Sequence, residues 1–161
     1  RHLAATGHTR IGVLLDHRER NSIRLRLHGA RSLSPDATAP EWSPPAGSPP
    51  DAVSEAIGSV TAVIAFESEL ADSLLQLLGA AGVSVPADLS VCTFDQGTME
   101  TQRPGFVTHI RQPLYRLGAT AIETALALRS SPKDAATGVN LLPCRLVVGT
   151  STAPPVSTTR G

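Results

Sequence analysis

The sequence predicts an α/β fold in which helices flank a mainly parallel β-sheet. Three short, largely apolar runs carry this prediction, at residues 11–15, 61–66 and 89–94, and a segment with helical spacing follows each of the first two. Continuous apolar runs of this length suit strands that are covered on both faces, as the strands of a parallel sheet are. Strands that alternate with helices favour a parallel sheet, because each parallel crossover needs a long connection.

Local signals define the elements of the first half of the chain. Residues 1–7 (RHLAATG) read as the end of a helix, with Gly7 as its C-terminal cap, because glycine adopts the left-handed conformation easily. We expect a helix at residues 22–33 with Ser22 as its N-cap. Six prolines between residues 35 and 50 exclude a regular helix there and predict a loop or linker, with a short strand around residues 37–42.

The second half continues the alternation of strands and helices. A short helix is expected at residues 51–58, and a longer one at residues 67–81 carries a stripe of leucine and alanine side chains and ends at Gly82. A further strand is expected at residues 106–110. The strongest helical pattern covers residues 113–129, and the last strands are expected within residues 141–148.

Acidic residues follow three of the predicted strands, at Asp16, Glu67 and Asp95. Ligands of open α/β sheets bind beyond the carboxyl ends of the strands, so these side chains mark a candidate binding edge. From position alone, Asp95 is either an acceptor for ligand hydroxyl groups or a turn-forming aspartate. Trp42, the one tryptophan, either stacks on a ligand ring or packs within the proline-rich loop.

Composition and motifs restrict the function classes. Apolar residues make up 41% of the chain and aromatic residues 3%, so the core must be aliphatic, and a net charge of zero disfavours a free-standing nucleic-acid binder. Cofactor-binding loops, nucleophile elbows and metal-ligand spacings are all missing from the sequence, which predicts no cofactor, no metal and no catalytic residue. No apolar run is long enough to cross a membrane, and two isolated cysteines fit a reducing cytoplasm.

Several motifs, in the right order and spacing, resemble the LacI/GalR family of transcriptional regulators. GAAGVSVPADLSVCTFD at residues 79–95 resembles the family's pattern of glycine, Val-Pro, Ser-Val and a final aromatic–Asp pair. THIRQP at residues 108–113 resembles the family's T-T-hydrophobic-R-Q-P. Similar matches occur at residues 1–11, 22–29, 61–71 and 148–154, although the arginine usual in the last of these is missing.

This resemblance implies a periplasmic-binding-protein-like fold of two α/β lobes around a ligand cleft, with the N-terminal lobe incomplete. It also implies a small-molecule effector, a homodimer that uses the face of helix 67–81, and operator DNA contacted only through a helix-turn-helix headpiece outside this chain. The implied division is a remnant of the N-terminal lobe at residues 1–34, a linker at 35–50, the C-terminal lobe at 51–105, a return segment to the N-terminal lobe at 106–130, and the final strands and tail at 131–161.

The resemblance also assigns candidate ligand contacts. Glu67 stands where the family usually has asparagine, so it adds a negative charge near Asp95 and predicts a ligand with hydrogen-bond donors or positive charge. The positions that match ligand-contacting positions of the family are Asp95, Arg26, Ser22, Glu67, Trp42 and Leu114.

Two other functions compete with an effector-sensing region of a regulator. One is a transport-type solute-binding protein of the same fold. The other is a small α/β enzyme in which Asp16, Glu67 and Asp95 form an acid/base set, although no residue pattern in the sequence would orient a nucleophile.

Overall fold

The computed structural model describes residues 1–15, 20–33, 41–42, 60–95, 102–130 and 139–156. These residues form a six-stranded sheet in the order β2-β1-β3-β4-β5-β6. The first five strands in this order are parallel, and β6 runs antiparallel to β5, which confirms the predicted mainly parallel sheet. The strands are β1 (Ile11–Leu14), β2 (Glu41–Trp42), β3 (Ala62–Ala65), β4 (Ser90–Phe94), β5 (Thr108–Arg111) and β6 (Arg145–Val147).

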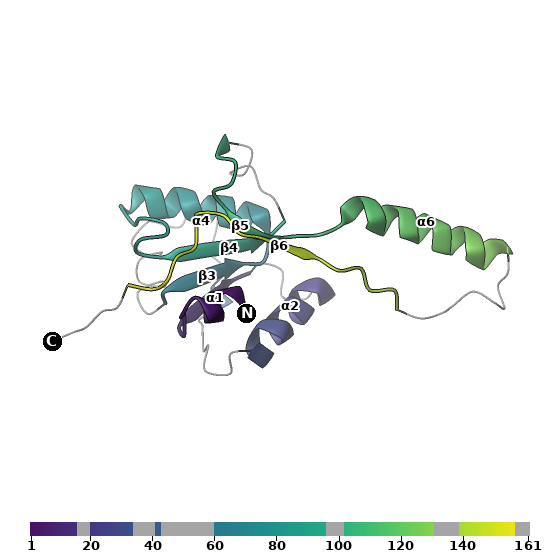
Figure 1. The fold of residues 1–161 in the computed structure, drawn as a ribbon, viewed down its shortest axis with the longest axis horizontal. Coiled ribbons are helices and arrows are strands. Elements are labelled where there is room, and N and C mark those ends of the chain that lie inside the picture. Colours follow the sequence, from purple (N-terminus) through teal and green to yellow (C-terminus); the bar gives the residue numbers. More distant parts are fainter. Residues whose placement is uncertain (16–19, 34–40, 43–59, 96–101, 131–138, 157–161) are drawn as a thin grey trace.

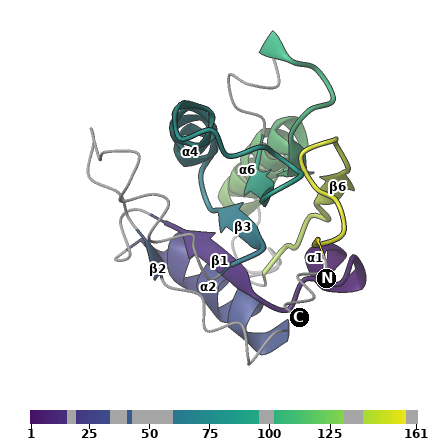
Figure 2. The same cartoon turned by 90° about the vertical axis from the view of Figure 1, so that its left-hand side faces the viewer.

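Helices lie on both faces of this sheet. One face carries α4, and the opposite face carries α1 and α2, whereas α6 extends away from the sheet (Figures 1 and 2). Their bounds are α1 (His2–Ala5), α2 (Asn21–Leu33), α4 (Ser68–Ala80) and α6 (Leu114–Ser130). The helix expected at residues 51–58, and the segment that holds Asp16, lie outside the described residues.

One sheet joins segments that the resemblance assigned to different lobes. Strand β1 pairs with β3 over four consecutive residue pairs, from Ile11 with Ala62 to Leu14 with Ala65. The assignment of residues 1–34 to an N-terminal lobe is therefore wrong for β1, and for α2, whose Ile23 packs against this sheet. The apolar run of β1 is covered on both faces, as a central strand requires.

Helix ends follow the local sequence with one exception. Gly7 and Gly82 adopt φ angles of +97° and +72° directly after the caps of α1 and α4, which confirms both predicted glycine stops. Helix α2, however, begins at Asn21, so Ser22 is a first-turn residue and the prediction of Ser22 as N-cap is wrong. Asn21 and Ser22 are both good N-cap residues, so local preference could not choose between them.

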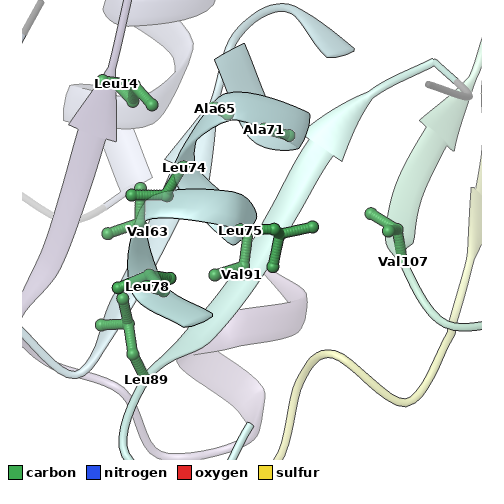
Figure 3. Packing of buried hydrophobic residues seen from close by; sticks show 10 residues of the cluster. All are labelled: Leu14, Val63, Ala65, Ala71, Leu74, Leu75, Leu78, Leu89, Val91 and Val107. Carbon is green, nitrogen blue, oxygen red and sulfur yellow. The ribbon is translucent and has the colours of Figure 1, made fainter. Parts of the chain in front are cut away.

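Helix α4 packs its leucines into the main hydrophobic core. Leu74, Leu75 and Leu78 are each at most 8% exposed and meet Val63 and Val91 of the sheet (Figure 3). The leucine stripe of this helix is thus buried within the chain. An interface on α4 would have to use its other positions.

A smaller core on the opposite face holds the two aromatic side chains that end β3 and β4. The rings of Phe66 and Phe94 meet edge to face, with centroids 5.8 Å apart and an interplanar angle of 87°. Ile23 of α2 and Val13 of β1 belong to the same cluster. This cluster fixes α2 against the ends of the central strands, where the candidate site lies.

The C-terminal segment ties down the amino ends of the strands. His8 lies 3% exposed between the Thr61 hydroxyl, at 2.9 Å from Nδ1, and the Ala153 carbonyl oxygen, at 2.8 Å from Nε2. The Ser151 hydroxyl donates to the Val91 carbonyl at 2.6 Å. Residues 151–153 are thereby bonded to the amino ends of β1, β3 and β4.

The two cysteines differ in environment, and this predicts selective labelling. Burial raises the pKa of the Cys92 thiol to about 12, whereas Cys144 is exposed. At pH 8.5 we expect a disulfide reagent that reacts with thiolate to modify Cys144 quickly and Cys92 more slowly, because the Cys92 thiol stays protonated. Equal rates for the two thiols, measured by peptide mass spectrometry, would contradict this. Because the folded-state pKa of Cys92 exceeds its usual 9.0, its contribution to stability falls as the pH rises above that value.

Candidate functional site

The candidate site lies at the edge where β1, β3, β4 and β5 end, which we call the carboxyl edge. Polar side chains reach it from four places: the start of α2, the β3–α4 junction, the end of β4 and the end of β5. The parallel register brings these ends together, since Leu14 pairs with Ala65 and Ala65 with Thr93. The residues concerned are Arg20, Arg26, Glu67, Asp95 and Gln112.

Asp95 directly follows β4 and has an unusual backbone conformation. Its φ is +63°, a left-handed value that aspartate adopts more readily than most residues but that still has a cost. Its backbone N–H donates to the Ile110 carbonyl at 2.8 Å, which holds the turn against β5. The carboxylate accepts hydrogen bonds from Gln112, from the backbone N–H at 3.2 Å and from the side-chain amide. Asp95 is therefore a fixed acceptor rather than a mobile surface carboxylate.

Arg26 is held on the sheet side of α2. Its Nη1 donates to the Phe66 carbonyl oxygen, and its guanidinium carbon lies 4.3 Å from the centroid of the Phe94 ring. A carbonyl bond and a cation–π contact together restrict the long side chain. The guanidinium group is thus presented at the carboxyl edge in a defined position.

Glu67 does not carry an isolated negative charge. Its Oε1 lies 2.8 Å from Nη1 of Arg20, with the side chains 26% and 53% exposed. The acidic cleft that Glu67 predicted is therefore not seen at this residue, because a guanidinium offsets its charge. Arg20 precedes α2, 47 positions away in sequence, and so could not be paired with Glu67 from spacing.

The structure says less about the three other predicted ligand-contacting residues. Ser22 is exposed on the first turn of α2, and Leu114 opens α6 with 65% of its surface exposed, two residues beyond Gln112. The backbone of Trp42 pairs with Leu14 at the same edge, but its side chain lies outside what the structure describes. Gln112 was missed as a site residue, although its place directly after β5 is the signal that could have identified it.

An apolar cavity of about 660 Å³ adjoins this edge on the face that carries α1 and α2. Its floor is the sheet, including Ile64 and Cys92, and its walls include Leu3 and Leu27. Arg26 and Phe94 stand at its border with the carboxyl edge. Thr93, Thr108 and His109 also line this cavity, but the oriented acceptor of Asp95 and the oriented donor of Arg26 lie at or beside the carboxyl edge, so the edge is the better candidate for recognition.

Two further kinds of site are not found within the described part of the chain. No group of three or more histidine, cysteine, aspartate or glutamate side chains there is arranged to hold a metal ion. None of the described helices is both long and apolar enough to cross a membrane.

Comparisons with known proteins identify the family of this fold. The family model of the periplasmic binding protein-like domain matches residues 1–152. The HTH-type transcriptional repressor PurR of Photobacterium profundum is 31% identical over 133 residues, which cover 76% of this chain and 40% of that protein. The chain thus spans less than half the length of this relative.

Solved structures show the same fold. A dimeric lac repressor with an 11-residue C-terminal deletion superimposes with a TM-score of 0.77 at 27% identity, covering 96% of this chain and 59% of that one. A LacI family regulator from Enterococcus faecium, with bound ribose, gives a TM-score of 0.74 at 26% identity over 95% and 60%.

The matched relatives are transcriptional regulators, which confirms the expectation that the chain is not an enzyme. The family match covers nearly the whole chain, and the fold and the order of the motifs agree with it. The chain belongs to the periplasmic-binding-protein-like domain family, in the form that LacI/GalR-type regulators carry as their C-terminal effector-binding region.

Proposed function

We propose that this chain is the effector-sensing and dimerisation region of a LacI-type transcriptional regulator. A small molecule binds at the carboxyl edge, between this sheet and a second lobe. The observation that carries the proposal is the fixed Asp95 carboxylate, held by Gln112 beside the positioned Arg26 guanidinium. Together they offer an oriented acceptor and an oriented donor to the hydroxyl groups of a ligand.

The long helix α6 supports the presence of a second lobe. None of its residues is buried, and Leu114, Ile122 and Leu126 are each more than half exposed. A 17-residue helix with exposed aliphatic side chains needs a covering surface. In the return segment 106–130, β5 stays in this sheet, and α6 docks on the N-terminal lobe of the regulator.

The connection between β5 and α6 links the proposed ligand site to the second lobe. Gln112 lies between β5 and α6, and its side chain is bonded to Asp95. A ligand that engages Asp95 alters the bond that holds this connection. Effector binding then shifts the population between open and closed lobes, and only a difference in affinity for the two states can drive that shift.

The remaining partners follow from the relatives. The chain forms a homodimer, as in the dimeric lac repressor. Operator DNA is contacted through a helix-turn-helix headpiece outside this chain, and the regulator acts in the cytoplasm. The competing assignment to a transport-type solute-binding protein receives no support from the relatives, whose names describe regulators.

Replacing Asp95 by alanine tests the proposal. We expect about a 100-fold weaker effector affinity, because two charge-assisted hydrogen bonds are lost at roughly 1.5–3 kcal/mol each, in part offset by water. Isothermal titration of the full-length regulator measures this, after a thermal-shift screen of monosaccharides, sugar acids, sugar phosphates and nucleobases selects the ligand. Asp88→Ala, an exposed carboxylate just before β4 at the amino ends of the strands, is the matched control. Unchanged affinity in the Asp95 variant would contradict the proposed site.

A further inference from the structure

Two arginines face each other at the carboxyl edge. Arg111 ends β5, Arg145 begins β6, and the two are directly opposite in the antiparallel register. Opposite residues of an antiparallel pair have Cα atoms about 4.5–5.5 Å apart and side chains on the same face of the sheet. Both side chains are exposed. Like charges in this arrangement repel each other and destabilise the pair.

The described part of the chain supplies no acid to offset this repulsion. Neither Arg111 nor Arg145 forms an ion pair there, and the ion pair found at this edge joins Arg20 to Glu67. The Asp95 carboxylate is engaged by Gln112. Both nearby carboxylates therefore already have partners, whereas the two opposed guanidinium groups have no acidic partner among the described residues.

The arginine pair adjoins the proposed effector site. Arg111 immediately precedes Gln112, and β5 lies beside β4, which Asp95 directly follows. A guanidinium group presents a planar fork of N–H donors that matches the oxygens of a phosphate or a carboxylate. Two such forks on one face can bind a single anionic group from two sides.

We propose that Arg111 and Arg145 bind an anionic group, a phosphate ester or a carboxylate, carried by the effector. This inference rests on the proposed function and specifies the ligand class of the same edge. A hydroxyl-bearing part of the ligand contacts Asp95, and the anionic group relieves the repulsion between Arg111 and Arg145, whose side chains lie on the face of the sheet that carries α4. The ligand is then anionic rather than cationic, because the charge of Glu67 is offset by Arg20.

The first test compares ligands that differ only in charge, in the full-length regulator. Titration with a hexose, the same hexose 6-phosphate and the corresponding hexuronate separates the phosphate and carboxylate sources. We expect the anionic forms to bind at least about tenfold more tightly, with Arg145→Gln and Arg111→Gln each removing most of that difference. Arg10→Gln, exposed directly before β1 at the amino ends of the strands, is the matched control and leaves the difference intact.

The second test measures the thermal midpoint without effector. We expect Arg145→Glu to raise the midpoint by pairing with Arg111, and to abolish stabilisation by inorganic phosphate measured against chloride at equal ionic strength. A lower midpoint in ligand-free Arg145→Gln protein would show that an acidic side chain from another segment already pairs with these arginines, and would overturn the inference.

The outcomes separate this inference from the proposed function. Equal affinity for hexose and hexose phosphate, with Asp95→Ala weakening both, would overturn the anion site and leave the proposed function in place. Anion binding that Arg145→Gln abolishes, but Asp95→Ala leaves unchanged, would support the anion site and contradict the proposed role of Asp95.

Discussion

Replacement of Phe66 by alanine is expected to lower the free energy of unfolding by about 3–5 kcal/mol. Phe66 is 1% exposed and packs edge to face against Phe94. The substitution removes a fully buried ring and leaves a cavity that the parallel strands cannot close, because their backbone hydrogen bonds fix their spacing. It also leaves the Phe94 ring, and the guanidinium of Arg26 above it, without lateral support.

Urea denaturation followed by circular dichroism measures this change. Leu25→Ala is a matched control on α2, because Leu25 is 63% exposed and its removal is expected to cost less than about 0.5–1 kcal/mol. A loss below about 1 kcal/mol for Phe66→Ala would show that the small core beneath α2 contributes little to stability. Effector affinity should also fall, since Arg26 loses its fixed position.

Replacement of Gly149 by alanine is also expected to lower stability strongly, because no side chain fits at this position. A Cβ there would lie 2.5 Å from the Phe106 carbonyl oxygen and 2.8 Å from the carbonyl carbons of Phe106 and Val107. These are backbone atoms, so the clash cannot be relieved by a rotamer change. We expect Gly149→Ala to destabilise the protein by about 2–3 kcal/mol and to weaken the nearby bonds of Ser151 and Thr108.

Gly79→Ala provides the contrast for this prediction. Gly79 lies within α4, and a Cβ added there would have no atom within 4 Å outside the helix's own backbone, so alanine should raise stability by about 0.5–1 kcal/mol. Differential scanning calorimetry of both variants compares their midpoints. Equal thermal midpoints for the two variants would contradict this prediction. They would mean that the segment around Gly149 can move away from β5 at little cost in free energy.

Much of the fold could be predicted because it depends on neighbouring residues. Apolar runs identified the parallel strands, helical spacing identified α4 and α6, and Gly7 and Gly82 marked helix ends through their access to the left-handed conformation. The place of β1 beside β3 was assigned wrongly, because strand pairing is a non-local choice that the local pattern does not specify. The start of α2 was missed by one residue for a different reason, since two good caps stand side by side.

The candidate site, too, could be predicted only in part. Glu67 and Asp95 could be placed at one edge because each follows a strand, and parallel strands end together. Their partners Arg20 and Gln112 could not, because these contacts join residues 47 and 17 positions apart on different elements. The predicted acidic cleft failed for this reason, since the sequence shows charges but not which of them meet.

By itself, then, the sequence determined the class of fold and the resemblance to LacI/GalR-type regulators, and it placed Glu67 and Asp95 at the edge proposed for ligand binding, because each depends on local patterns and their order along the chain. Only the tertiary structure decided that β1 belongs to the same sheet as β3, that Arg20 offsets Glu67, and that Arg111 faces Arg145. Such contacts form only when distant segments of the chain pair in the folded sheet. The free energy that favours them comes from packing and charge pairing between those segments.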